Sequence, residues 1–82
     1  MNTTEINQKI KVGAVFEGSL IKPKWFMWVN KKFEVKKIAM RWKSSEGSAT
    51  ILHFSITDEK NMYELSFNQK TMEWMLNKIG VE

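Results

Sequence analysis

The chain of 82 residues lacks cysteine and contains a single histidine and a single proline. Without cysteine it has no disulfide, no thiolate nucleophile and no cysteine-ligated metal. The lone histidine, His53, rules out within one chain a zinc or iron site that requires two imidazoles. We therefore expect neither a metal nor another cofactor, and the composition suits a reducing cytoplasm.

Long apolar segments and targeting signals are also missing. No apolar run approaches the ~18 residues of a transmembrane helix. The first residues, Met1–Glu5, have neither the basic nor the apolar part of a signal peptide. We expect a cytoplasmic protein that does not enter a membrane.

Residues arranged for catalysis are scarce. Ser55 lies two residues from His53, and the pair could act as nucleophile and base, although an outward histidine is more often a surface residue. Asp58 and Glu59 are adjacent carboxylates in a segment typical of a turn. The glycines are too scattered to form a phosphate-binding loop; they are Gly13, Gly18, Gly47 and Gly80. The sequence predicts a protein that is not an enzyme.

The chain is rich in apolar and aromatic residues. Hydrophobic residues make up 43% of the sequence and aromatic residues 12%, which is more than disordered segments carry. A chain of this length forms one domain, so we assign residues 1–82 to a single domain.

Positive charge is concentrated in the first half. The net charge is +4, but residues 1–43 hold ten basic residues against three acidic ones, whereas residues 44–82 hold three against six. A positive half beside a negative half can orient a polyanion or an acidic partner. Twelve of the thirteen basic residues are lysines, which also serve solubility and protect exposed strand edges.

Turn signals recur at short spacing, a pattern typical of an all-β domain. The period-two alternation of apolar and polar residues predicts strands over about 10–21, 25–29, 32–43, 49–57, 62–67 and 72–79. Pro23 removes a backbone donor, so it marks a strand boundary or an edge. Turns are expected at Asn30–Lys31, in 44–48, at 58–61 and at 68–71.

The two ends of the chain allow a second interpretation. Residues 1–9 are either flexible or contain a short helical turn over 2–8, capped by Thr3 or Thr4. Residues 72–79 also fit helical spacing, but they follow a series of strands, so we expect a strand.

The apolar alternation changes phase within 32–43. The apolar residues Phe33 and Val35 are at odd-numbered positions, whereas Ile38, Met40 and Trp42 are at even-numbered positions. We expect a β-bulge or sharp bend at Lys36–Lys37. The alternative is a strand buried on both faces near its centre.

Five or six antiparallel strands in so short a chain favour a meander that forms a strongly bent sheet or a small, partly open barrel. We therefore expect a single-domain, all-β fold. Its inner face is predicted to contain Phe16, Phe26, Trp28, Phe33, Val35, Leu52, Phe54, Ile56, Tyr63, Leu65, Phe67 and Trp74.

The most distinctive segment, residues 22–33, interleaves basic and aromatic side chains. On a strand, Trp25 and Met27 face one side while Phe26 and Trp28 face the other, and a small barrel buries only one set. Exposed aromatic rings beside lysines suit single-stranded or distorted nucleic acid, which needs flat faces for its bases and cations for its phosphates. Trp25 is predicted to stack and the others to neutralise phosphates in a binding site of Lys22, Lys24, Trp25, Lys31, Lys32, Lys36, Lys37, Arg41 and Lys43.

Two other interpretations of these residues stay open. All of these aromatic residues could belong to the core of a domain that has few large side chains. Alternatively, the domain could be a protein–protein interaction module, because Trp, Phe, Met and basic residues also make interaction hot spots. Such a module could be a homodimer that covers Trp25 and Met27 or pairs its open edge strands.

The same stretch resembles a small, uncharacterised bacterial all-β domain family with the pattern P-x-x-F-x-W-x-[GN]-x-x-[FY]-x-V, followed by a Trp near the end of the next strand. The corresponding residues are Pro23, Phe26, Trp28, Asn30, Phe33, Val35 and Trp42. A Tyr-Glu-Leu strand and a Trp-x-Leu strand of the family correspond to Tyr63-Glu64-Leu65 and Trp74-Met75-Leu76, so the similarity covers about residues 16–79. Some members occur beside, or fused to, error-prone translesion DNA polymerases, so the resemblance implies a compact β domain in a nucleic-acid context.

The chain also departs from this family. Asn30 stands where glycine is commoner, and lysines replace the arginines of Arg-rich members, which argues against a role that depends on arginine geometry. The resemblance supplies no catalytic residue. It also implies that Phe26, Trp28 and Phe33 belong to the core, which leaves Trp25 and Met27 as the exposed pair.

Overall fold

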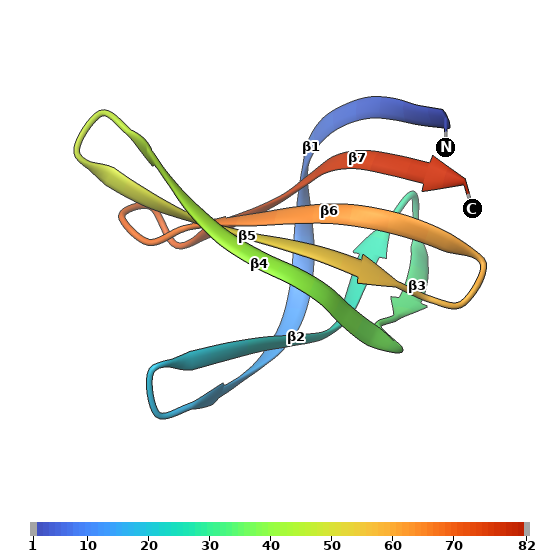
Figure 1. The fold of residues 1–82 in the computed structure, drawn as a ribbon, viewed down its shortest axis with the longest axis horizontal. Coiled ribbons are helices and arrows are strands. Elements are labelled where there is room, and N and C mark those ends of the chain that lie inside the picture. Colours follow the sequence, from blue (N-terminus) through green and yellow to red (C-terminus); the bar gives the residue numbers. More distant parts are fainter. Residues whose placement is uncertain (1, 82) are drawn as a thin grey trace.

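The structure, a computed structural model, describes residues 2–81 as a single antiparallel sheet of seven strands. The strands are β1 (Asn2–Glu17), β2 (Leu20–Trp28), β3 (Lys31–Glu34), β4 (Lys37–Glu46), β5 (Ala49–Thr57), β6 (Asn61–Asn68) and β7 (Glu73–Val81). They are ordered β3-β2-β1-β7-β6-β5-β4 across the sheet (Figure 1). The predicted all-β class is confirmed, and the strand number is seven rather than five or six.

The first strand is longer than expected because it has two partners. Asn2–Ile10 pairs with β7, and Lys11–Glu17 pairs with β2. The alternative of a helical turn over 2–8 is therefore wrong, since pairing with β7 overrides the local capping signal. Met1, part of the segment 1–9 that was expected to be flexible or to contain this turn, lies outside the described residues.

Tight turns account for most of the other differences in strand boundaries. The segment 10–21 is interrupted by a turn at Gly18, which has a φ of 62° that glycine adopts without cost. The turn expected at Asn30–Lys31 lies one residue earlier, at Val29–Asn30, where both residues have positive φ. The loop expected over 44–48 is a short turn at Gly47, so β4 extends to Glu46.

The phase change in 32–43 corresponds to a break between two strands. The expected single strand with a bulge or sharp bend at Lys36–Lys37, and the alternative of one strand buried on both faces, are both replaced by two separate strands, β3 and β4, at opposite edges of the sheet. Val35 donates its N–H to the Lys24 carbonyl of β2, and Lys36 donates its N–H to the Thr57 carbonyl of β5, each at 2.9 Å. This link joins the two edges at one end of the sheet, although β3 and β4 do not pair within residues 2–81.

A bulge does occur in β4, at Ala39. The register changes from Ile38 opposite Ile56 to Met40 opposite Ser55. Because Ile56 belongs to the core and Ser55 faces outward, the bulge turns Met40 and every second residue after it to the outer face.

The core forms where the bent sheet folds over itself. Its buried residues are Ile21, Phe26, Phe54, Ile56, Tyr63, Leu65, Phe67 and Leu76. The predicted residues Trp28, Phe33, Val35, Leu52 and Trp74 are partly buried against them. Phe16 was predicted to lie inside, but its side chain is 59% exposed because the hairpin of β1 and β2 extends beyond the body of the sheet (Figure 1).

Candidate functional site

Strand β3 pairs with β2 only from Trp25 to Trp28, so the preceding part of β2 forms a free edge. Beyond the Val35–Lys36 link, this part of β2 and strand β4 diverge and leave a seam between them (Figure 1). A cleft of about 320 Å³ lies in this seam. It is lined by Ser19, Leu20, Ile21, Arg41, Trp42, Lys43, Leu52, His53, Phe54 and Gln69. Its floor is apolar, and its β4 side carries cations.

Arg41 spans the seam. Its Nη1 donates a hydrogen bond to the carbonyl of Ile21 on β2, and its guanidinium lies 5.4 Å from the ring centre of Phe54. A carbonyl on an unpaired strand edge needs a donor, and the arginine side chain supplies it where no neighbouring strand is present. Arg41 therefore holds β2 and β4 together while its side chain remains exposed.

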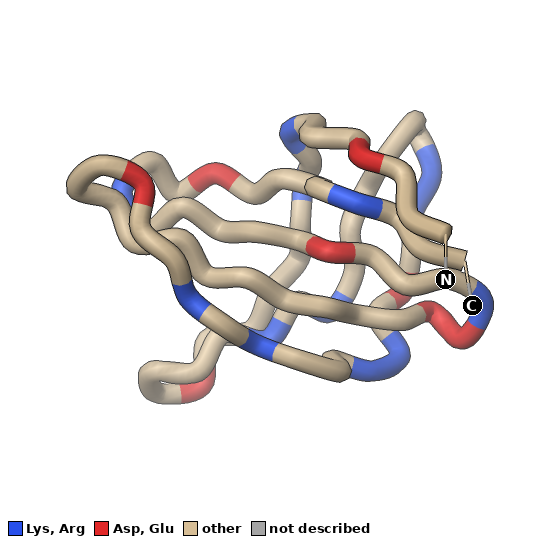
Figure 2. Tube along the Cα trace, turned by 45° about the horizontal axis from the view of Figure 1, so that its top comes forward, with Lys and Arg blue, Asp and Glu red and all other residues tan. Residues whose placement is uncertain are grey.

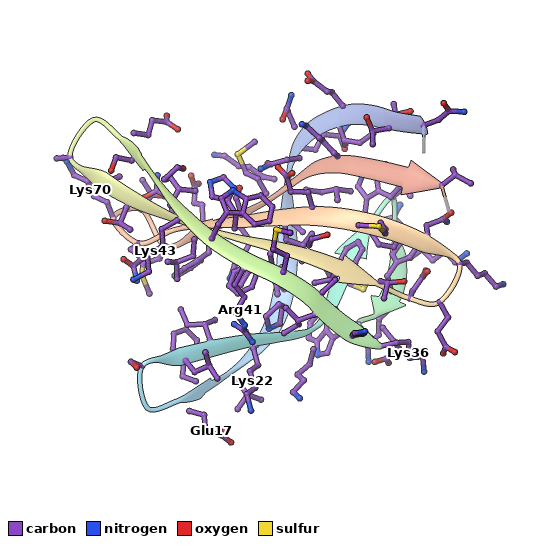
Figure 3. All side chains as sticks on the ribbon, viewed as in Figure 1. Glu17, Lys22, Lys36, Arg41, Lys43 and Lys70 are labelled. Carbon is purple, nitrogen blue, oxygen red and sulfur yellow. The ribbon has the colours of Figure 1, made fainter. Side chains whose placement is uncertain are left out.

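Further cations lie along the seam. Figure 3 shows Lys22 and Arg41 beside the seam, with Lys36 toward the linked end and Lys43 toward the open end. Lys22 forms an ion pair with Glu17 at 2.9 Å, and its hydrogen bond and charge lower the pKa of the Glu17 carboxyl. Basic residues also occur on other parts of the sheet (Figure 2), so positive charge is not confined to the seam.

Trp42 lies between Arg41 and Lys43 on β4. Directly across the ladder from it is His53 of β5, and the two rings are stacked, 5.1 Å apart at 4°. The His53 ring is held in turn by a hydrogen bond of 2.7 Å between its Nε2 and Ser44 Oγ. Trp42 is 36% exposed. His53 of β5 supports one face of the indole, and β4 is the last strand of the sheet, so no further strand pairs beyond Trp42.

Trp25, the predicted stacking residue, is half-buried and is contacted from both neighbouring strands, β1 and β3. Its indole lies against the backbone of Gly13, where a Cβ would overlap the ring. The Lys32 ammonium lies over the indole at 5.3 Å and also contacts Glu34 at 3.5 Å. A base would therefore have to displace Lys32 before it stacked on Trp25.

The remaining predicted residues do not share one face with the seam. Lys24 is exposed at the irregularity of β2 opposite Gly13 and Ala14, and Lys37 is exposed where β4 begins. Lys31 lies 5.5 Å from the ring centre of Phe33. All nine predicted residues thus come from β2, β3, β4 or the link before β4, but only Arg41 and Lys43 line the cleft.

Sequence reasoning missed Trp42 as a candidate stacking residue. The tripeptide Arg41-Trp42-Lys43 carries the same signal as the earlier basic and aromatic segment. Its importance depends on two features that only the structure supplies: the bulge at Ala39, and the position of β4 at the edge of the sheet.

The site contains one pair of groups with possible acid–base chemistry. Ser44, and not the predicted Ser55, contacts His53, and the Nδ1 atom of His53 is buried without a hydrogen-bond partner. No carboxylate is hydrogen-bonded to this imidazole among the described residues. Within residues 2–81, no group of three or more His, Cys, Asp or Glu side chains is arranged to hold a metal ion.

Comparisons with known proteins add no further constraint. No family model, curated protein or solved structure matches the chain. The resemblance to the bacterial domain family therefore remains an expectation. Residues 2–81 include no helix with the length and hydropathy needed to span a bilayer.

Proposed function

We propose that this domain binds single-stranded nucleic acid, without catalysis, at the seam between β2 and β4. One observation carries the proposal: Trp42, a partly exposed residue of the edge strand β4, is stacked on His53 and lies between the cations Arg41 and Lys43. A flat aromatic face and adjacent cations are what an unpaired base and its phosphates require.

The geometry of an edge strand favours this arrangement. Successive side chains of β4 alternate between its two faces, so the Trp42 side chain lies on the opposite face from those of Arg41 and Lys43, although all three residues border the cleft. A polynucleotide that crosses the edge of β4 can stack a base on Trp42 and place the adjoining phosphates beside the two cations. Stacking of one base on an aromatic side chain stabilises such complexes by about 1 to 3 kcal/mol.

The other predicted residues extend this site. Lys22, Lys24, Lys36 and Lys37 flank the seam and attract the phosphate backbone through charge, without reading its sequence. Trp25 becomes a secondary stacking position, which opens only when Lys32 leaves its ring and contacts a phosphate instead.

The same residues disfavour the alternative of a homodimer formed by two β4 edges. In a two-fold antiparallel pairing, side chains opposite each other lie on the same face. Any such pairing centred between residues 41 and 43 places Arg41 or Lys43 of one copy opposite Arg41 or Lys43 of the other. Like charges directly opposite each other are destabilising, so an anionic ligand fits this edge better than a second copy.

The test is quenching of tryptophan fluorescence by an oligothymidylate of about ten nucleotides, at about 50 and about 200 mM salt. We expect saturable quenching that weakens steeply with salt. Trp42→Ala should weaken binding about tenfold or more, whereas Trp25→Ala, the matched control, should have a smaller effect. Lys43→Ala should reduce the salt dependence, while Lys78→Ala on β7 should not.

Two results would refute the proposal. The first is the absence of binding at the lower salt concentration. The second is binding that Trp42→Ala leaves unchanged. A stable dimer in high salt, seen by sedimentation, would instead favour an apolar protein interface, because a contact driven by charge weakens with salt.

A further inference from the structure

The hairpin opposite β4 exposes apolar side chains at the open end of the seam. Phe16 is 59% exposed and Leu20 is 42% exposed, on either side of the turn at Gly18. Phe16 lies directly opposite Ile21 on the β1–β2 ladder, and Ile21 and Leu20 line the cleft. Phe16 therefore shares a face of the hairpin with Ile21 and adjoins the cleft without being part of its lining. A large apolar side chain exposed beside a cleft is a candidate binding contact.

This apolar surface adjoins the cations of β4. The Arg41 guanidinium contacts the backbone of Ile21, which is the cross-strand neighbour of Phe16. Residues directly opposite each other on a ladder have Cβ atoms about 5 Å apart. Phe16 is therefore adjacent to Ile21, the residue whose carbonyl accepts the hydrogen bond from Arg41. The cleft between the two sides measures about 320 Å³, near the lower end of the range for ligand sites of about 300 to 1,000 Å³.

We infer that the cleft holds a second nucleotide of the same bound strand, with its base against Phe16 and Ile21 and its phosphate against Arg41 and Lys43. This inference rests on the proposed function. The strand then crosses the seam from Trp42 on the β4 side to Phe16 on the β1–β2 hairpin. Positive charge on one wall and apolar surface on the other favour a nucleotide, which has an anionic group and a flat apolar face.

The binding mode predicts that the ligand bridges the two edges of the sheet. Within the described residues, the seam is connected by the link at Val35–Lys36 and by the Arg41 side chain. A nucleotide in the cleft adds a third connection at the open end. Binding should therefore slow amide hydrogen exchange in the β1–β2 hairpin, which the site at Trp42 alone would not affect.

The experiment compares three variants of the hairpin by titration with the same oligothymidylate. Phe16→Ala should weaken binding about fivefold or more, and Phe16→Trp should restore it and add a fluorescence signal that the oligonucleotide quenches. Val15→Ala is the matched control, because Val15 is 44% exposed on the same strand but points to the outer face, away from the cleft. It should bind as the unmodified protein does.

The outcomes separate this inference from the proposed function. If Phe16→Ala binds normally while Trp42→Ala is impaired, the second nucleotide site is wrong and the proposed function stands. If the unmodified protein binds no oligonucleotide, both fail. Binding of an acidic peptide of alternating glutamate and valine, without oligonucleotide binding, would overturn both in favour of a protein partner. Circular dichroism of Phe16→Ala establishes that the variant is folded before its binding is compared.

Discussion

The indole of Trp42 lies parallel to the imidazole of His53, with ring centres 5.1 Å apart and an angle of 4° between the planes. The imidazole is oriented by Ser44, so a chain of contacts from β4 to β5 and back holds the indole in place. A ring held in this way loses little conformational freedom when a ligand stacks on it, which strengthens binding.

His53 is therefore a positioning residue for Trp42. His53→Ala removes the ring that supports the indole of Trp42. Part of the favourable free energy of stacking is then offset by the cost of ordering the indole, so oligonucleotide binding should weaken about threefold to tenfold. His53→Phe restores a flat ring and should recover most of the affinity. Fluorescence titration of both variants checks this. Equal loss in the two variants would mean that the histidine acts through its polar atoms.

Gly13 provides the space that the Trp25 indole occupies. A methyl group at residue 13 would overlap this ring, so Gly13→Ala should displace it and cost about 1 to 3 kcal/mol of unfolding free energy. In a Trp25→Ala background the same substitution should cost much less. Urea denaturation of the unmodified protein, the two single variants and the double variant measures the energetic coupling between residues 13 and 25. A cost that is equal in both backgrounds would show that the glycine serves another purpose.

Asp58 organises the turn between β5 and β6. Its Oδ1 accepts hydrogen bonds from the N–H groups of Lys60 and Asn61, and its Oδ2 accepts one from the Tyr63 hydroxyl. Burial raises the pKa of the Asp58 carboxyl, but these hydrogen bonds outweigh burial, and the pKa lies below its ordinary value of 3.8. The carboxylate is thus better stabilised in the folded protein than in the unfolded chain.

The pH dependence follows from the direction of this shift. A lowered pKa contributes stability that is fully present above the pKa of the unfolded carboxyl and is lost as the pH falls through the folded pKa. Asp58→Asn should therefore reduce the free energy of unfolding by about 1 kcal/mol at pH 7. The difference between the two proteins should shrink below a pH of about 3.9. Urea denaturation of both proteins at pH 7 and below a pH of about 3.9 tests this. A difference in the free energy of unfolding that does not change with pH would contradict it.

Phe26 lies at the centre of the aromatic core. Its side chain has no exposed surface, and it stacks on Phe33 at 5.0 Å and meets the edge of Tyr63 at 5.1 Å. Phe26→Ala should cost about 3 to 5 kcal/mol, a large part of the stability of a small domain. Phe16→Ala, at an exposed position, should cost less than about 0.5 kcal/mol. Thermal denaturation that ranks them in the opposite order would contradict the assigned core.

Local patterns in the sequence were sufficient to predict the later strands and most of the core. Strand β5 was predicted with its observed bounds, and the alternation of Leu52, Phe54 and Ile56 identified its inner face. Such alternation is informative because each of these strands has one face toward the core and short turns at both ends.

The remaining features depend on which strands become neighbours. The helical turn over 2–8 was wrong because pairing with β7, which is distant in sequence, outweighs a weak local signal. Phe16 points to the same face of the sheet as the core residues, but it lies beyond the end of the core and is exposed. Period-two spacing in a sequence predicts the face of a residue and cannot show where the core ends. The coverage of Trp25 by Gly13 and Lys32, and the support of Trp42 by His53, likewise arise from cross-strand contacts.

If the proposed function is correct, a nucleic-acid strand stacks on Trp42 at the seam. The most direct measurement is a two-dimensional ¹H–¹⁵N NMR titration that follows the indole N–H signals of Trp25, Trp28, Trp42 and Trp74 as oligothymidylate is added at low salt. We expect the Trp42 signal to shift most, together with the backbone amides of Arg41 and Lys43. The signals of Trp28 and Trp74, which pack against the core, should shift least. A spectrum that does not change, or one in which Trp25 shifts and Trp42 does not, would contradict the proposed function.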